Sequence, residues 1–321
     1  MEFRRVELRA MGSPCALHLY AEGPERLEAL VAHCRAEIER LEAKYSRYRD
    51  DSLVSRVNAS AGDPAGIEVD DETAALLDYA DTAHRQSRGL FDITSGALRR
   101  AWDFRSGRLP ARETVDALRA RVGWQRVRWQ RPRFVLPTQG MEIDFGGVVK
   151  EYAADRIAEL CRERGARHGL IDLGGDLAVV GPHPDGRPWR VGIRDPRERS
   201  RPLTSVAVYA GGVATSGDYE RCMVIDGVTY GHLLDPRTGW PVRGPISVTV
   251  LAPHCLIAGT TSTVAMLSGE AGARAWLDAV GLPNVRVDRS GRVHADWELN
   301  RSGTPPRRPA PRDRSSAAST G

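Results

Sequence analysis

"HGLIDLGGDLAVVG", residues 168–181, contains two short apolar runs separated by Gly174 and Gly175. Runs of Leu, Ile and Val of this length favour β-strands, and paired glycines supply the backbone angles that a tight turn needs. The pattern therefore predicts two strands joined by a hairpin or a bulge. These glycines need no ligand to explain them.

Comparable apolar runs fill the rest of the second half of the chain, where turns rich in Gly, Pro and Asp separate them. We expect short strands at residues 189–193, 204–216, 222–226 and 246–253. The first 21 residues also alternate apolar and polar side chains, as a strand does.

Helical periodicity marks the remaining elements. Residues 24–45 carry apolar side chains at helical spacing behind Pro24, which predicts one long amphipathic helix. Further helices are expected at residues 72–87, 150–164, about 257–268 and near 271–280. Because strands and helices come in long runs without strict β-α-β alternation, we predict an α+β fold with mixed, largely antiparallel sheets flanked by helices.

The composition suits a folded protein with a short charged tail. The chain has 321 residues, 41% of them hydrophobic, and we expect one large domain over residues 1–300. Residues 301–321 are rich in Pro, Arg and Ser and should be disordered. They hold five Arg and one Asp, so their net charge accounts for the whole formal charge of +4. The rest is close to neutral, so charge gives no reason to expect a nucleic-acid partner.

The sequence also carries signals about location. No apolar run approaches the roughly 20 residues that a membrane helix needs, so no transmembrane segment is expected. The start lacks the apolar core and cleavage site of a signal peptide. The five cysteines are scattered without a CxxC pair, so neither a disulfide framework nor a zinc site is indicated. We predict a cytoplasmic protein, or a periplasmic one if the true start lies upstream.

"IDFGGVVKEYAADRIAEL", residues 143–160, runs from a strand through two glycines into a helix. Amides at the helix start and the charge of Lys150 are suited to hold a phosphate, and Asp144 is suited to bind a ring or a ribose. The alternative is an ordinary strand-to-helix turn. Lys150 is one of only two lysines among 46 basic residues, which favours a need for its compact charge.

Residues 213–242 gather groups that donate, accept or relay protons. Thr215 and Ser216 follow an apolar strand and offer hydroxyls and amides from an expected loop. His232 precedes a turn predicted at Asp235 and Pro236. Histidine is the side chain best suited to exchange a proton near neutral pH, although a structural, hydrogen-bonded histidine is the simpler interpretation.

Eight segments together resemble the FAD:protein FMN transferases of the ApbE type, in order and approximate spacing, over about residues 8–285. They are AMGSPCALHLYA, YSRYRDDSLVSRVNAS, GLFDITSGAL, IDFGGVVKEYAADR, IDLGGDLAVVG, VATSGDYER, HLLDPRTGWPV and AGTTSTVAMLSG.

The resemblance implies a single large ApbE-like domain, similar to a T-fold, and a defined reaction. Such enzymes bind FAD as substrate, attach its FMN half to a threonine of a partner protein through a phosphoester, and release AMP with the help of Mg²⁺. The partner would therefore be an acceptor flavoprotein.

The same resemblance assigns roles to residues of this chain. It implies cofactor contacts for Met11, Tyr48, Phe91, Asp92, Asp144, Lys150, Thr215 and Ser216, metal ligation by Gly147 and Thr263, and a proton-accepting role for His232. Within this set, Met11 and Tyr48 would contact the flavin, Asp144 the adenine, and Lys150 the phosphates.

The chain departs from the family pattern at two positions. An Asp usually stands four residues before the metal-binding threonine, but here the residue is Gly259. Glu151 also follows Lys150 where a glycine is commoner. Magnesium prefers an anionic oxygen ligand, so FAD phosphates and water, or another acid such as Asp218, would have to complete the site.

These departures leave three functional hypotheses. The first is an active flavin transferase. The second is an FAD-binding protein that has lost transfer because Gly259 replaces the metal-ligand Asp. The third, outside flavin chemistry, is an interaction module that uses its basic tail.

Overall fold

A computed structural model describes residues 1–198, 202–219 and 222–297. Its centre is an eight-stranded sheet in which all neighbouring strands are antiparallel, in the order β1-β2-β6-β7-β10-β13-β14-β15. These strands are β1 (Glu2–Ala10), β2 (Ser13–Ala21), β6 (Gly169–Leu173), β7 (Asp176–Gly181), β10 (Gly211–Gly217), β13 (Ser247–Ala252), β14 (Asn284–Val287) and β15 (Val293–Ala295).

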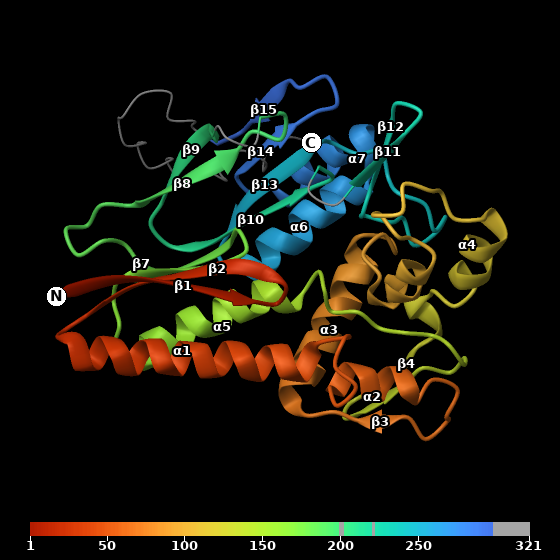
Figure 1. The fold of residues 1–321 in the computed structure, drawn as a ribbon, viewed down its shortest axis with the longest axis horizontal. Helices are drawn as coiled ribbons and strands as arrows, with labels where there is room; N and C mark the ends of the chain where they lie inside the picture. The colour runs from red at the N-terminus through yellow and green to blue at the C-terminus, as the bar shows by residue number, and fades with distance from the viewer. Residues whose placement is uncertain (199–201, 220–221, 298–321) are drawn as a thin grey trace, which may run out of the picture.

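Three long helices pack with this sheet around the main core: α1 (Pro24–Tyr45), α5 (Val149–Glu163) and α6 (Cys255–Leu267). In Figure 1, α1 and α5 run beneath β1 and β2, while α6 runs beside β10 and β13. Helix α1 begins at Pro24, whose fixed φ suits the first turn, and its apolar stripe from Leu27 to Leu41 is buried. Helix α7 (Gly269–Val280) packs on α6.

A second, smaller core contains side chains of the sheet and of a two-stranded ribbon, β8 (Trp189–Arg194) and β9 (Pro202–Val208). Neighbouring residues of β6 show the alternation: Ile171 joins the helix-covered core, and Leu170 joins the second core. Because successive strand side chains point to opposite faces, the sheet is apolar on both sides.

The segment between α1 and α5 holds the smaller elements, which lie to the right in Figure 1. They are α2 (Leu53–Ala59), β3 (Ile67–Glu68), α3 (Asp71–Gln86), the 3₁₀ helix η1 (Ile93–Arg100), α4 (Arg112–Arg119), the 3₁₀ helix η2 (Trp124–Arg126), β4 (Arg128–Gln130) and β5 (Arg133–Val135). A further ribbon, β11 (Cys222–Ile225) and β12 (Val228–Gly231), follows β10.

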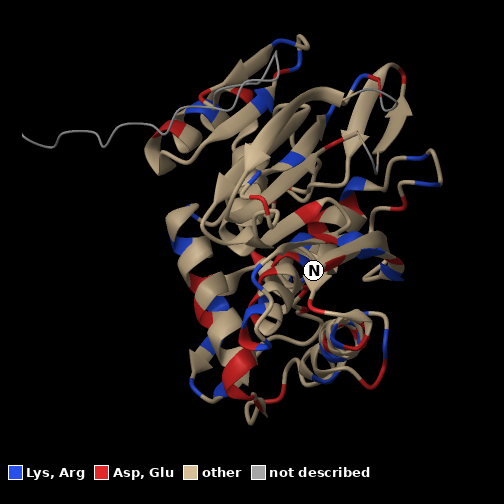
Figure 2. Cartoon of the chain, turned by 90° about the vertical axis from the view of Figure 1, so that its left-hand side faces the viewer, with Lys and Arg blue, Asp and Glu red and all other residues tan. Residues whose placement is uncertain are grey.

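Glu72 of α3 ties three helices together. It accepts hydrogen bonds from Arg40 and Lys44 of α1 and from the Tyr152 hydroxyl of α5. Burial alone would raise the pKa of Glu72, but these donors outweigh it and lower the pKa to about 2. Elsewhere charges of both signs are interspersed along the surface helices (Figure 2).

The α+β architecture and the antiparallel sheet predicted from the sequence are confirmed. All five predicted helices are present, as α1, α3, α5, α6 and α7, each within two residues of its expected ends where an end was given exactly. The turn at Gly174 and Gly175 is a two-residue hairpin that joins Leu173 to Asp176, and both glycines have positive φ. Helices α2 and α4 and strands β14 and β15 were not predicted.

Other expectations have different outcomes. All five cysteines are free thiols. Among the described residues, no helix is long and apolar enough to cross a membrane. The predicted tail, residues 301–321, lies outside the described residues.

Candidate active site

Two hairpin turns meet at one end of the sheet. The first joins β1 to β2 through Met11 and Gly12, and the second joins β6 to β7 through Gly174. Strand β2 pairs with β6 up to Cys15 and Leu173, so both turns lie at the same end of the sheet. A Cβ added to Gly174 would lie 2.7 Å from the Cβ of Ser13, so only glycine allows this approach.

The first turn of α5 lies at the same end of the sheet and contributes Lys150. Its ammonium forms an ion pair with Asp176, the first residue of β7, at 2.5 Å. Burial alone would lower the pKa of Lys150, but the carboxylates of Asp176 and Glu151 outweigh it and raise the pKa above its usual value. The carboxylate of Asp176 also accepts the backbone N–H of Thr215. Strand β10 is thereby linked to α5 through one buried carboxylate.

Helix α6 lies against α5 and is anchored by it. Asp155 of α5 accepts the first free N–H groups of α6, from Cys255 at 2.8 Å and Leu256 at 2.9 Å. A carboxylate satisfies amides that a helix N-terminus leaves without partners. One turn back along α5, Glu151 lies against Gly259 of α6. The two helices are therefore antiparallel at this contact.

Hydroxyl groups of β10 and α6 face one another next to this contact. The Ser216 hydroxyl lies 2.8 Å from that of Ser262 and 3.0 Å from that of Thr263. Thr215 bonds instead to Thr249 of β13, at 2.8 Å. Thr215 and Ser216 both continue β10 and pair with β13, so the strand expected through residue 216 is present there and the loop expected at these two residues is wrong.

Asp144 anchors the loop that leads into α5. Its carboxylate accepts hydrogen bonds from Arg47 at 2.9 Å and from the backbone N–H of Gly146 at 2.8 Å, and Arg99 lies 3.2 Å away. The carboxylate is mostly buried and is neutralised by two guanidinium groups. An adenine contact through this side chain stays a prediction.

Phe91 and Asp92 lie just before η1, and both are buried. Asp92 caps η1 by accepting from the N–H and hydroxyl of Thr94, at 2.8 Å and 2.6 Å, and it also accepts from the N–H of Trp124 at 3.0 Å. These contacts give Asp92 a structural role, and its contact with a cofactor stays a prediction. The ring of Phe91 lies 3.9 Å from the position that a Cβ on Gly147 would take.

Met11 and Tyr48 are in unusual settings for their residue types. Met11 has a φ of 50°, in the left-handed region, where Asn or Gly is usual in a two-residue hairpin turn. Tyr48, in the loop after α1, is 82% exposed. An exposed aromatic ring and a strained methionine are features that ligand contact would explain.

His232 directly follows β12 and is half-buried. Gly231 packs on Asp218, since a Cβ at 231 would lie 2.8 Å from the Asp218 Cβ. This brings His232 to the end of β10, which is followed by Asp218. The turn predicted after it is confirmed, because the N–H groups of Thr238 and Gly239 both donate to the Asp235 carbonyl, at 3.2 Å and 2.7 Å.

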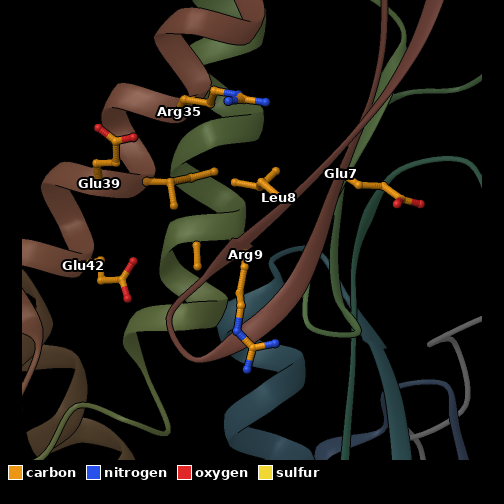
Figure 3. Close-up of a pocket in the computed structure, with 8 residues that line it drawn as sticks. Glu7, Leu8, Arg9, Arg35, Glu39 and Glu42 are labelled. Carbon is orange, nitrogen blue, oxygen red and sulfur yellow. The ribbon is translucent and has the colours of Figure 1, made fainter.

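A pocket of about 330 Å³ lies between β1 and α1 (Figure 3). Figure 3 shows Arg9 and Leu8 on the strand opposite Arg35, Glu39 and Glu42 on the helix. None of the residues that line it belongs to the set predicted for cofactor, metal or catalysis.

The structure thus groups Met11, Lys150, Thr215, Ser216 and Thr263 around one end of the sheet, and it places Asp144, Phe91 and Asp92 along the loops leading there. Sequence reasoning missed Asp176 and Asp155. Asp176 follows a glycine pair that a turn already explained, so its pairing with Lys150 left no signal. Asp155 lies four residues after Glu151, on the same face of α5, and that spacing is the signal that was overlooked.

Several proteins similar in sequence to this chain are named FAD:protein FMN transferase. The chain is 31% identical to the FAD:protein FMN transferase of Treponema pallidum over 288 residues, covering 84% of this chain and 79% of that protein. It is 28% identical to that of Escherichia coli K12, covering 91% and 86%. These relatives are enzymes by name.

Solved structures agree with the sequences. The ApbE protein from Thermotoga maritima matches with a TM-score of 0.84 at 28% identity, covering 92% of this chain and 97% of that one. The flavin transferase ApbE from Vibrio cholerae matches with a TM-score of 0.79 at 26% identity and the same coverage. The model of the ApbE family matches residues 11–285, and this protein therefore belongs to the ApbE family.

Proposed function

We propose that this protein is an FAD:protein FMN transferase that moves FMN from FAD to a threonine hydroxyl of an acceptor protein and releases AMP. The observation that carries the proposal is a chain of polar contacts at the junction of α5, α6 and β10. Lys150 pairs with Asp176, Asp176 accepts the N–H of Thr215 on β10, and the next residue, Ser216, bonds to Thr263 of α6. The proposal also rests on relatives of that name that match most of the chain.

Phosphoryl transfer from a dinucleotide requires positive charge near the diphosphate and an oriented acceptor. An ammonium has three N–H donors, and Asp176 occupies one of those of Lys150. The side chain of Lys150 is 26% exposed, so its remaining donors can face a ligand. Asp176 acts as the positioning residue, because it fixes the direction in which Lys150 points.

Flavin and adenine would both extend from this charge. Met11 and Tyr48 offer a thioether and an exposed ring to the isoalloxazine, and Asp144, which is bonded to Arg47 beside Tyr48, lies at the loop that leads to α5. Ser216 of β10 would face the diphosphate, and Thr215, whose side chain points to the other face toward Thr249, would contribute through its main chain. Phe91 and Asp92 would support the loop behind Gly147.

His232 is the residue that we assign to accept the proton of the attacking threonine. Imidazole suits this task because its ordinary pKa lies near neutrality. The rigid turn after His232 and the packing of Gly231 on Asp218 would hold its ring at the end of β10.

Mg²⁺ is the cation we propose for the reaction, held by Thr263 and the carbonyl of Gly147. When bound, it would neutralise charge on the phosphate oxygens. Among the described residues, no group of three or more His, Cys, Asp or Glu is arranged to hold a metal ion. Mg²⁺ is often held by only one or two protein carboxylates together with substrate phosphates and water, so it does not require such a group.

The test needs no identified acceptor. Purified protein is incubated with FAD and MgCl₂, and the hydrolysis of FAD to FMN and AMP, with water in place of the threonine, is followed by chromatography. In parallel, the protein is added to a lysate of its source organism with FAD, and denatured polypeptides are examined for covalent flavin fluorescence. We expect a new fluorescent band that requires the protein.

His232→Ala should abolish the band, whereas His33→Ala, a histidine on α1, should leave it intact. Absence of both AMP release and covalent fluorescence with Mg²⁺ and with Mn²⁺ would reject the proposal.

The second candidate function, FAD binding without transfer, is favoured by one observation, the glycine at position 259. It predicts a protein that binds FAD tightly and yields no covalent product. The same assay separates the two candidates.

A further inference from the structure

Gly259 of α6 and Glu151 of α5 face the same small space between the two helices. A Cβ added to Gly259 would lie 2.6 Å from the Cγ of Glu151, 3.0 Å from its Cδ and 2.9 Å from its Oε1. The carboxylate of Glu151 thus lies where a short side chain at 259 would place its own atoms. The two departures from the family pattern are in direct contact.

The carboxylate of Glu151 is buried and incompletely paired. Glu151 is 7% exposed, and its Oε2 atom has no hydrogen-bond partner among the described residues. Burial, assisted by Asp176, raises the pKa of Glu151. A buried acidic oxygen without a partner costs free energy, so its presence calls for a ligand or a proton.

The other acids near this point are already engaged. Asp176 is paired with Lys150, and Asp155 caps α6. Asp218, which sequence reasoning offered as a substitute metal ligand, forms an ion pair with Arg289.

Helix geometry places Glu151 beside the other expected cation ligands. Residues 259 and 263 lie one turn apart on the same face of α6. The α5–α6 contacts pair Asp155 with Cys255 and Glu151 with Gly259, in opposite sequence directions. One further turn brings Gly147, just ahead of α5, toward Thr263.

We propose that Glu151 supplies the anionic oxygen of the divalent-cation site, so that the carboxylate has moved from α6 to α5 while Gly259 leaves room for it. The proposal rests on the proposed function, since FAD phosphates complete the shell. The donor set is then one carboxylate, the hydroxyl of Thr263 and a main-chain carbonyl, all hard oxygens that suit Mg²⁺.

Direct metal binding tests this assignment. Free Mn²⁺ is measured by electron paramagnetic resonance during titration of the protein with saturating FAD. Glu151→Gln keeps the shape of the side chain and removes its charge, and it should weaken Mn²⁺ binding by about tenfold or more. Glu159→Gln, on the exposed face of the same helix, is the matched control and should bind as the parent does.

An exchange of the two positions makes the test sharper. Glu151→Gly alone should lose the cation, and Gly259→Asp alone should be overpacked against Glu151. The double variant Glu151→Gly/Gly259→Asp should bind Mn²⁺ within about threefold of the parent, because it restores one acid to the same space. Circular dichroism checks that each variant folds. If the exchange variants do not fold, the Mn²⁺ affinity of Glu151→Gln decides the test by itself.

Parent-like Mn²⁺ affinity in Glu151→Gln would overturn the assignment, as would a parent protein that binds FAD but no Mn²⁺. FAD affinity is measured separately in EDTA by quenching of flavin fluorescence. If the parent does not bind FAD under any of these conditions, the proposed function itself fails.

Discussion

Replacing Lys150 by Met would leave the Asp176 carboxylate buried without its cation. Asp176 has a side chain that is 5% exposed, whereas Lys150 is 26% exposed. Removing one partner of a buried ion pair costs about 3–5 kcal/mol. Because Asp176 keeps the N–H of Thr215 as a donor, we expect the lower end, about 3 kcal/mol, in the free energy of unfolding.

The reverse change should cost less. In Asp176→Asn the ammonium of Lys150 can turn toward water through its exposed side, so we expect a loss of about 1–2 kcal/mol. In the double variant Lys150→Met/Asp176→Asn no buried charge remains at this pair. Its loss should be smaller than the sum of the two single losses by about 1 kcal/mol or more.

Urea unfolding at neutral pH without FAD measures all three values, and FAD titration of the same proteins measures affinity. The double variant should lose less stability than the two single losses together, without recovering FAD affinity, since the charge that faces the diphosphate is still absent. A loss below about 1 kcal/mol in Lys150→Met, or strictly additive losses, would refute the reasoning that a buried pair links α5 to β7.

Three further changes probe other parts of the structure. Met11→Asn should relieve the left-handed strain and raise the free energy of unfolding by about 1 kcal/mol, while it weakens FAD binding. Thermal unfolding with and without FAD measures both effects. Unchanged FAD affinity would count against a flavin contact. Glu72 has a pKa lowered from 4.5 to about 2, so the stability it adds is complete above pH 4.5 and is lost as the pH falls through about 2; Glu72→Gln should flatten this acid limb in urea unfolding, and an unaltered limb would contradict the assignment. Asp155→Ala should lower the free energy of unfolding by about 2 kcal/mol because two amides of α6 lose their acceptor, and an unchanged urea midpoint would show that the cap is unimportant.

Local patterns were enough to predict the elements that bury a regular stripe. The helix at residues 24–45 and the hairpin at Gly174 and Gly175 were predictable because apolar spacing and paired glycines act within a few residues. Helix α4 was missed because only two of its eight residues are buried. Strand β14 was missed because all four of its residues are buried although one of them is charged. That residue is Arg286, which is neutralised by Glu270 of α7.

The candidate site was predictable only in part, for a related reason. Lys150 and His232 stood out by residue type, and the family resemblance gave most of the other positions. The contacts of Asp176, Asp155 and Glu151 depend on how α5 meets β7 and α6. They join residues 26 to 108 positions apart and so leave no local pattern.

The contact between Gly259 and Glu151 also constrains how such a chain can change over time. With an acid at both positions, the two side chains overfill one space. With an acid at neither position, the cation site has no carboxylate. A change from one arrangement to the other by single substitutions therefore passes through an impaired intermediate. Two separate lineages of the site should therefore exist, one with its acid on each helix. A survey that inspects only the α6 position would count members of the second lineage as inactive enzymes.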